Sequence, residues 1–314
     1  MALLVIHPGL NTTVQDRGRV GYREFGVPVG GAFDRASLDL ANALVGNDPD
    51  AAALELTLVG GTYRAEAHLA IALAGAPLSA SIRSAEGADR SLDIPQSIAL
   101  RAGDDLVIGG SATGARAYLA VRGGFLTPLI LGSRSSETRL GAGTVLPARP
   151  GSITPSRRPV AWPWAVLPPG EPIRVVDGPD AGRSPVDARV LESAEFRVSG
   201  QSNRMGLRLD GPTLDAPTPS DRASAPVAPG AVQVAGGRPI VLGVAGGTMG
   251  GYLHLAHVIA ADLDRLAQLG PGDPVRFRRV ELDEARQLDH ARRAALCRWL
   301  VRIRTRDSGF GTED

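Results

Sequence analysis

An arginine flanked by hydroxyl groups is the first feature of this sequence that could do chemistry. The run Gly132-Ser133-Arg134-Ser135-Ser136 lies in a predicted loop. A guanidinium binds a carboxylate or a phosphate through two parallel hydrogen bonds, and neighbouring serines add donors. The same residues also suit a capped turn with a solvated arginine, so both interpretations stay open. Serine hydrolase chemistry is not expected, because the run lacks the Gly-x-Ser-x-Gly turn that exposes a nucleophile.

A second candidate is the glycine-rich run Gly246-Gly247-Thr248-Met249-Gly250-Gly251-Tyr252, which follows the apolar residues 240–242. We expect a strand, this loop and then a helix. Glycine lets the backbone bend sharply and approach a ligand closely, and amides near a helix N-terminus suit oxyanions. A structural turn and a loop that lines a ligand pocket are both compatible with the run. A dinucleotide-binding loop is not expected, because repeated βαβ units are missing.

Histidines and aspartates supply the remaining candidates. His254 and His257 stand three residues apart at the start of the predicted helix, a spacing that can place two imidazoles on one metal ion. No cysteine, carboxylate or further histidine follows at ligand spacing, so we expect no metal site. Asp34 suits either a helix N-cap or an acid/base group. Asp16, within 15–19, suits either a turn with internal ion pairs or a substrate contact.

Composition limits the class of protein. With 314 residues the chain is long enough for two domains, and 43% hydrophobic residues are typical of a globular protein. A net charge of +1 gives no electrostatic case for binding nucleic acid or an anionic membrane, and no apolar run is long enough to span a bilayer. Cys297 is the only cysteine, which fits a reducing compartment, so we expect a cytoplasmic protein.

Lysine is absent, so all 34 basic residues are arginine. A Walker A loop needs its lysine on the nucleotide phosphates, and a Schiff base needs a lysine amine. Biotin is attached to lysine, so this chain carries no covalently attached biotin. The missing residue type therefore excludes three kinds of chemistry from this chain.

The pattern of elements predicts a β-rich protein with few helices. Short strands are expected in the N-terminal half, together with one helix that Asp34 caps at its start and Gly46 at its end. A further helix is expected from the apolar spacing of Leu255, Val258, Ile259, Leu263 and Leu266, and a last one from Glu281 to about Arg304. We predict an N-terminal domain over 1–146, a proline-rich linker over 147–172, a C-terminal domain over 173–280 and a terminal helix and tail over 281–314.

Short motifs occur in order along nearly the whole chain. They include Thr13-Val14-Gln15-Asp16-x-Gly18-Arg19, Gly26-Val27-Pro28 with Asp34-Arg35, Ala53-Leu54-Glu55, Leu131-Gly132-Ser133-Arg134-Ser135, Arg204-Met205-Gly206, Pro229-Gly230-x-x-Gln233-Val234, Gly250-Gly251-Tyr252 and Ala261-Asp262-Leu263. In this order they resemble the carboxyltransferase-type family that includes the C-type subunit of 5-oxoprolinase, allophanate hydrolase subunit 2 and the carboxyltransferase region of urea amidolyases.

The resemblance implies two cyclophilin-like β-barrel domains and a B-type partner subunit. In one branch a third, A-type subunit joins them in the ATP-dependent opening of 5-oxoproline to glutamate, so ATP would act at the level of the complex on a small cyclic or carboxylated amide. A second branch transfers a carboxyl group from biotin, which another protein would have to supply here. A non-catalytic regulatory subunit is the third alternative.

The resemblance also implies which residues form the site. They imply substrate or carbonyl binding by Arg134, Arg204, Gln233, Thr248, Gly250, Gly251 and Tyr252, with Asp16 and Asp34 as weaker catalytic candidates. The sequence departs from the family pattern where Asn203, Ala245 and Gly247 replace two aspartates and a glutamine. These changes remove hydrogen-bond acceptors and acid/base groups near the expected pocket.

Overall fold

The protein is mainly β. A computed structural model describes residues 1–150, 170–182, 189–214 and 223–305. Strands account for 37% of the residues and helices for 18%, and the fold includes a nearly closed, barrel-shaped sheet, which confirms the predicted fold class. Contacts divide the chain into two units. Unit 1 comprises Met1–Gly18, Asp34–Val166 and Arg293–Asp314, and unit 2 comprises Arg19–Phe33 and Leu167–Arg292.

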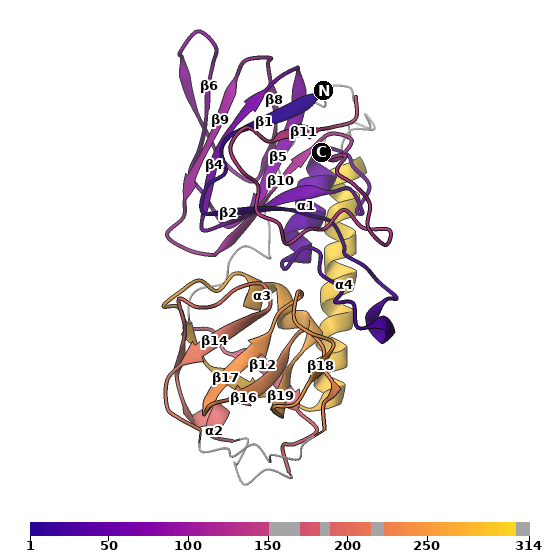
Figure 1. Cartoon of the computed structure of the whole chain (residues 1–314), viewed down its shortest axis with the longest axis vertical. Coiled ribbons are helices and arrows are strands. Elements are labelled where there is room, and N and C mark those ends of the chain that lie inside the picture. Colours follow the sequence, from indigo (N-terminus) through magenta and orange to yellow (C-terminus); the bar gives the residue numbers. More distant parts are fainter. Residues whose placement is uncertain (151–169, 183–188, 215–222, 306–314) are drawn as a thin grey trace, which may run out of the picture. The chain divides into compact units, whose positions relative to one another are not determined.

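Unit 1 contains two antiparallel sheets around one apolar core (Figure 1). The first has the order β11-β1-β4-β9-β6-β7 and the second the order β2-β3-β10-β5-β8. The strands are β1 (Ala2–His7), β2 (Asn11–Gln15), β3 (Ala53–Thr57), β4 (Val59–Ala65), β5 (Leu69–Gly75), β6 (Ala80–Arg83), β7 (Asp89–Leu92), β8 (Gln96–Leu100), β9 (Asp105–Gly110), β10 (Arg116–Val121) and β11 (Val145–Pro147).

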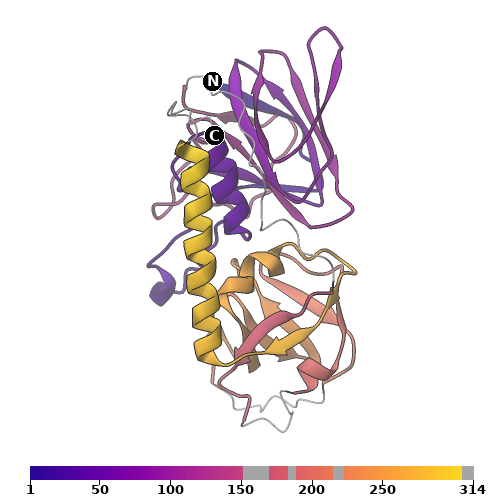
Figure 2. The ribbon, with the colours of Figure 1, turned by 180° about the vertical axis from the view of Figure 1, so that it is seen from behind.

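Helix α1 (Arg35–Leu44) packs on β5 and β10 of the second sheet (Figure 1). Its N-cap is the predicted one, because the Asp34 carboxylate accepts a hydrogen bond from the Ser37 amide at 3.0 Å. Gly46 follows the helix with a φ of 68°, a conformation that glycine adopts easily. The C-terminal part of α4 (Leu282–Thr305) lies beside α1 within this unit (Figure 2), where Arg304 donates to the Asn47 carbonyl.

Unit 2 contains an eight-stranded sheet of order β20-β13-β14-β17-β16-β19-β12-β21 and the two-stranded sheet β15-β18. Its elements are η1 (Arg23–Phe25), β12 (Ile173–Asp177), α2 (Val190–Ser193), β13 (Phe196–Val198), β14 (Gly206–Asp210), β15 (Ala225–Pro226), β16 (Ala231–Ala235), β17 (Arg238–Leu242), β18 (Met249–Gly250), β19 (Leu253–Val258), η2 (Ala260–Asp262), α3 (Leu263–Ala267), β20 (Pro274–Val275) and β21 (Phe277–Arg279), with the first part of α4.

The expected helix after the glycine-rich run is wrong. Residues 253–258 form strand β19, and only the short η2 and α3 are helical beyond it. The error comes from a β-bulge: β16 and β19 pair as Val232↔Ala256 and then Gln233↔His254, so Leu255 is an extra residue on β19. A bulge turns two successive residues to one face and thereby imitates helical spacing. The glycine-rich run therefore precedes a strand, so its amides do not lie at a helix N-terminus, where oxyanion binding was expected.

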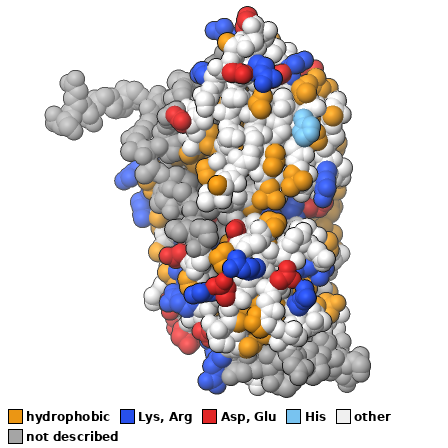
Figure 3. Space-filling model, turned by 90° about the vertical axis from the view of Figure 1, so that its left-hand side faces the viewer, with side chains coloured by type: hydrophobic (Ala, Val, Ile, Leu, Met, Phe, Trp, Pro, Cys, Tyr) orange, Lys and Arg blue, Asp and Glu red, His pale blue; other side chains and the backbone are white. Residues whose placement is uncertain are grey.

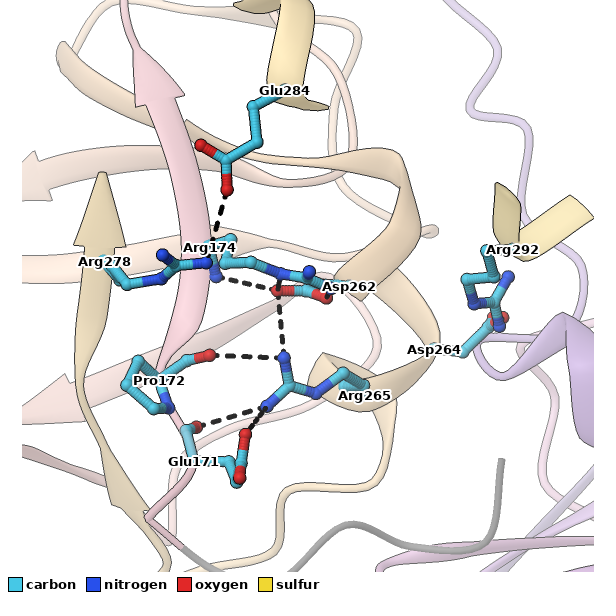
Figure 4. A network of polar contacts seen from close by, with 9 residues as sticks. All are labelled: Glu171, Pro172, Arg174, Asp262, Asp264, Arg265, Arg278, Glu284 and Arg292. Atoms are coloured by element: carbon cyan, nitrogen blue, oxygen red, sulfur yellow. Dashed lines mark hydrogen bonds and ion pairs between the residues drawn. The ribbon is translucent and has the colours of Figure 1, made fainter. Parts of the chain in front are cut away.

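A buried carboxylate joins β12 to α3 in unit 2 (Figure 4). Asp262 is 0% exposed and accepts from the Arg174 guanidinium at 2.5 and 3.0 Å and from Arg265 at 3.1 Å. Burial alone would raise the pKa of Asp262, but these partners outweigh burial and hold the pKa below its ordinary value. This motif residue therefore stabilises the fold, because neutralising it would leave two guanidinium groups without their carboxylate.

The surface carries mixed charge. On the face shown in Figure 3, arginine side chains are interspersed with acidic ones, which agrees with the net charge of +1. No helix in the described part of the chain is long and apolar enough to cross a membrane. The linker predicted at 147–172 lies mostly outside the described residues, and the predicted domain boundaries stay predictions.

Candidate functional site

The predicted site residues fall in both units. Asp16, Asp34 and Arg134 belong to unit 1, whereas Arg204, Gln233, Thr248, Gly250, Gly251 and Tyr252 belong to unit 2.

In unit 1, Asp16 holds together the loop that contains Arg134. Its carboxylate accepts from Ser133 Oγ and Ser135 Oγ, both at 2.6 Å, from the Arg134 amide at 2.5 Å and from the Gly18 amide at 2.8 Å. We call these five residues the Asp16 clamp. Burial alone would raise the pKa of Asp16, but the four donors outweigh burial and lower it. Four donors match the capacity of an ionised carboxylate, so the clamp has the geometry of a structural turn.

Arg134 takes part in this turn with both its backbone and its side chain. Leu131 and Gly132 have φ of 51° and 76°, and Ile130 and Ser133 exchange backbone hydrogen bonds of 2.8 and 3.2 Å across them. The Arg134 guanidinium donates to the Thr127 carbonyl, so one of its N–H groups is already engaged within the loop. Anion binding by this side chain stays a prediction.

Asp34 belongs to a buried polar layer between α1 and the second sheet of unit 1. Its carboxylate caps α1, and its amide donates to Tyr118 Oη at 2.9 Å. Tyr118 in turn donates to Glu55 Oε2 at 2.6 Å, and burial together with the Glu55 charge raises the pKa of Tyr118 well above its ordinary value. The structure therefore gives Asp34 a capping role.

In unit 2, Gln233 faces the glycine-rich run from strand β16. Its side chain is 4% exposed, and its Nε2 has no hydrogen-bond partner. A Cβ on Gly250 would stand 2.7 Å from this nitrogen and 3.3 Å from Val227 Cγ1, so a larger residue here would displace the Gln233 amide. Among the predicted site residues, all of which are described, only Gln233 has a buried polar side-chain atom without a partner. A buried donor without an acceptor is costly unless a ligand or water supplies one.

The other predicted site residues of unit 2 differ in burial and in their hydrogen bonds. Thr248 is buried and its carbonyl accepts from the Val227 amide at 2.9 Å, which ties the glycine-rich run to the residue after β15. Gly251 lies on the other side of Gly250, and Tyr252 is 49% exposed. The Arg204 guanidinium donates to the Gly31 carbonyl at 2.6 Å.

His254 and His257 lie beside Gln233 on the same strand ladder, whereas the sequence pattern had placed them on a helix. His254 pairs with Gln233 across β16 and β19, and the bulge at Leu255 brings His257 to the same face. Their facing nitrogens, His254 Nε2 and His257 Nδ1, lie 3.4 Å apart. Burial, and to a lesser extent the neighbouring His254, lowers the pKa of His257 to about 4. We call Gln233, Gly250, His254 and His257 the Gln233 corner.

Clusters of three or more metal-ligating side chains are missing from the described ranges when cysteine, histidine, aspartate and glutamate are considered. The Gln233 corner thus offers an amide donor and the imidazole of His257, whose lowered pKa keeps it neutral near pH 7, whereas the Asp16 clamp offers an ionised carboxylate that is already bonded. Of the two, the corner is the better candidate for binding a ligand.

Comparison with known proteins identifies relatives over almost the whole chain. The family model described as carboxyltransferase domain, subdomain A and B, matches residues 25–279. The chain is 37% identical to the C-type subunit of 5-oxoprolinase from Escherichia coli, over 90% of this chain and 93% of that protein. It is 33% identical to the urea amidolyase of Lachancea kluyveri, where it covers 94% of this chain but 18% of the relative. The crystal structure of the K. lactis urea amidolyase superposes with a TM-score of 0.82 at 31% identity, over 95% of this chain and 20% of that one.

Proposed function

Because the chain belongs to the carboxyltransferase domain family, we propose that it is the C-type subunit of a 5-oxoprolinase-like, ATP-dependent complex. The complex would hydrolyse a small cyclic or carboxylated amide, of which 5-oxoproline is the reference case. Support comes from the extent of the similarity, since the chain covers 93% of the 5-oxoprolinase relative and a small share of the urea amidolyases.

The observation that carries the proposal is the unpartnered Nε2 of Gln233. Opening an amide bond places negative charge on the carbonyl oxygen, and fixed hydrogen-bond donors stabilise that charge. Gln233 Nε2 is such a donor: it is buried, held on a strand and turned towards the Gly250 backbone. In this proposal Gln233 donates to the substrate oxygen, and Gly250 keeps the space beside it open.

Partner subunits complete the proposed enzyme. The chain has no lysine for a Walker A loop, so ATP would be handled at the level of the complex with B-type and A-type subunits. The free and exposed thiol of Cys297 fits a reducing compartment, and the proposal includes a cytoplasmic location.

Biotin-dependent carboxyl transfer is a second candidate, favoured by the match to a domain of the K. lactis urea amidolyase. Biotin would then be supplied by another protein. The amide donor of Gln233 suits this reaction as well, because a carboxyl group also has an oxygen to hold.

The test is a reconstitution of this chain with B-type and A-type subunits. We expect ATP-dependent conversion of 5-oxoproline to glutamate by the complex and none by this chain alone. Gln233→Leu should lower kcat/KM about 100-fold in the assembled complex, whereas the control Gln201→Leu, at an exposed position, should not.

Three results would overturn parts of the proposal. Turnover of urea with carboxybiotin in place of 5-oxoproline would favour carboxyl transfer. A stable complex without either activity would favour a regulatory role. Full activity of Gln233→Leu would show that Gln233 is not the donor to the substrate oxygen, but it would not contradict the proposed reaction class.

A further inference from the structure

The imidazoles of His254 and His257 converge for a reason that lies in the backbone. In a regular strand, residues three apart face opposite sides of the sheet. Here Leu255 is the extra residue of the bulge, and both Leu255 and Ala256 pack into the apolar core of unit 2. The two histidines consequently share the opposite face, which is also the face of Gln233. Bulges often re-aim side chains at functional sites in this way.

The geometry of the two rings suits a shared ligand. His254 Nε2 and His257 Nδ1 are 3.4 Å apart, with ring centroids at 5.4 Å and planes tilted by 47°. Two nitrogens bound to one zinc ion at 2.0–2.1 Å in a tetrahedron stand about 3.3 Å apart. The two nitrogens share a hydrogen bond at this distance, and the separation is also close to the edge of such a tetrahedron, so a cation bound by both rings would replace the proton that they share.

The second nitrogen of His257 is fixed by the backbone. His257 hydrogen-bonds Pro229, and because proline has no amide hydrogen, the imidazole is the donor and the Pro229 carbonyl the acceptor. The Nε2 atom faces this turn, since a Cβ on Gly230 would lie 3.3 Å from it. With Nε2 protonated, a neutral His257 presents the lone pair of Nδ1 towards His254. Metal-binding histidines commonly donate their other nitrogen to a carbonyl in this manner.

Gln233 stands next to the pair and carries the unpartnered amide. Directly opposed residues of antiparallel strands have Cβ atoms about 5 Å apart, so this amide is within reach of His254. No carboxylate or thiolate of the described residues completes a cluster of three with the histidines. Coordination positions beyond the two imidazoles would thus be open to water or a bound molecule, to which Gln233 Nε2 would donate a hydrogen bond.

We propose that His254 and His257 form a two-imidazole binding site for one divalent d-block cation, of the class of Zn²⁺, Co²⁺ or Ni²⁺. Imidazole nitrogens suit these ions and suit Mg²⁺ or Ca²⁺ poorly. No metal site was expected from the sequence, because its pattern placed both histidines at a helix start without further ligands. The bulged strand instead brings both imidazoles to one face, where a cation would bind whether or not the chain has the proposed activity.

The experiment uses the full chain without an affinity tag, freed of metal with a chelator and titrated with Co²⁺. We expect one equivalent to bind, with visible absorption of a nitrogen-ligated ion, and Zn²⁺ to displace it. His254→Gln and His257→Gln should each weaken binding at least tenfold. The control His68→Gln, at an exposed histidine outside the corner, should bind as the parent protein does.

A second readout needs no variant and so does not depend on how the variants fold. In ¹⁵N spectra of the histidines, Zn²⁺ should shift His254 Nε2 and His257 Nδ1 and leave His7, His68 and His290 unchanged. The proposal is overturned if the parent protein takes up no Co²⁺, if both variants bind as tightly as it does, or if Zn²⁺ shifts the other histidines instead of this pair.

Discussion

The Asp16 clamp and the Gln233 corner are both buried polar groups carried on family motifs, yet their hydrogen bonding differs. The Asp16 carboxylate accepts four hydrogen bonds within its own loop, whereas Gln233 Nε2 has no partner at all. A buried polar group that is fully bonded contributes to stability, and one that is not bonded costs stability unless a ligand completes it. Burial and motif membership alone therefore do not distinguish structural from ligand-binding residues.

The two regions should also respond differently to substitution. Removing Asp16 would leave two hydroxyl groups and two backbone amides without their acceptor. Removing the Gln233 amide would take away a nitrogen that has no hydrogen-bond partner in the fold. Changes at the clamp should therefore act mainly on stability, and changes at the corner mainly on ligand binding.

Neutralising the clamp should give the largest effect. Asp16→Asn keeps the shape of the side chain but loses the charge and places a donor where four donors already converge. Hydrogen bonds to a charged group are worth about 1.5–3 kcal/mol each, so we expect a loss of about 3–5 kcal/mol in the free energy of unfolding. Denaturant unfolding measures it. A loss below about 1 kcal/mol would mean that the clamp is not structural.

The two regions should lose stability in different ranges of pH. The pKa of His257 is lowered from 6.5 to about 4, so between these values the unfolded chain binds a proton that the folded chain does not. Stability should thus fall as the pH drops from 6.5 to 4, by up to about 3 kcal/mol. Asp16, whose pKa is also lowered, contributes stability above its unfolded pKa and loses it only as the pH falls further, through its folded pKa.

Thermal unfolding across this range separates the two contributions. His257→Gln should flatten the dependence between pH 6.5 and 4, whereas Asp16→Asn should leave that part of the curve as it is. If the stability of His257→Gln still falls between pH 6.5 and 4 as steeply as that of the parent protein, His257 is not the group responsible.

Trimming one donor of the clamp should have a smaller effect. Ser135→Ala removes the 2.6 Å hydrogen bond to Asp16 and the acceptor of the Asp16 amide, and we expect a loss of about 1–2 kcal/mol. Ser136→Ala is the matched control, because its hydroxyl accepts only an exposed bond from the Thr138 amide. Calorimetry of both variants checks the order, and equal losses would contradict it.

Much of this organisation could be predicted from the sequence, and the part that could not has a local cause. The cap at Asp34 and the last helix follow from short patterns. The strand β19 does not, because the bulge at Leu255 gives Leu255, Val258 and Ile259 the spacing of a helix face. The hydrogen bonds of Asp16 were equally hidden, since Ser133 and Ser135 are more than a hundred residues away in the chain.

The free energy of unfolding of Gln233→Leu tests the contrast between clamp and corner most directly. Leucine replaces the amide with an apolar group of similar size in a site that is 4% exposed. Because Nε2 has no partner, the variant should unfold within about 0.5 kcal/mol of the parent protein, or be more stable. A loss of about 2 kcal/mol or more would show that the fold itself uses the Gln233 amide, and it would contradict the account.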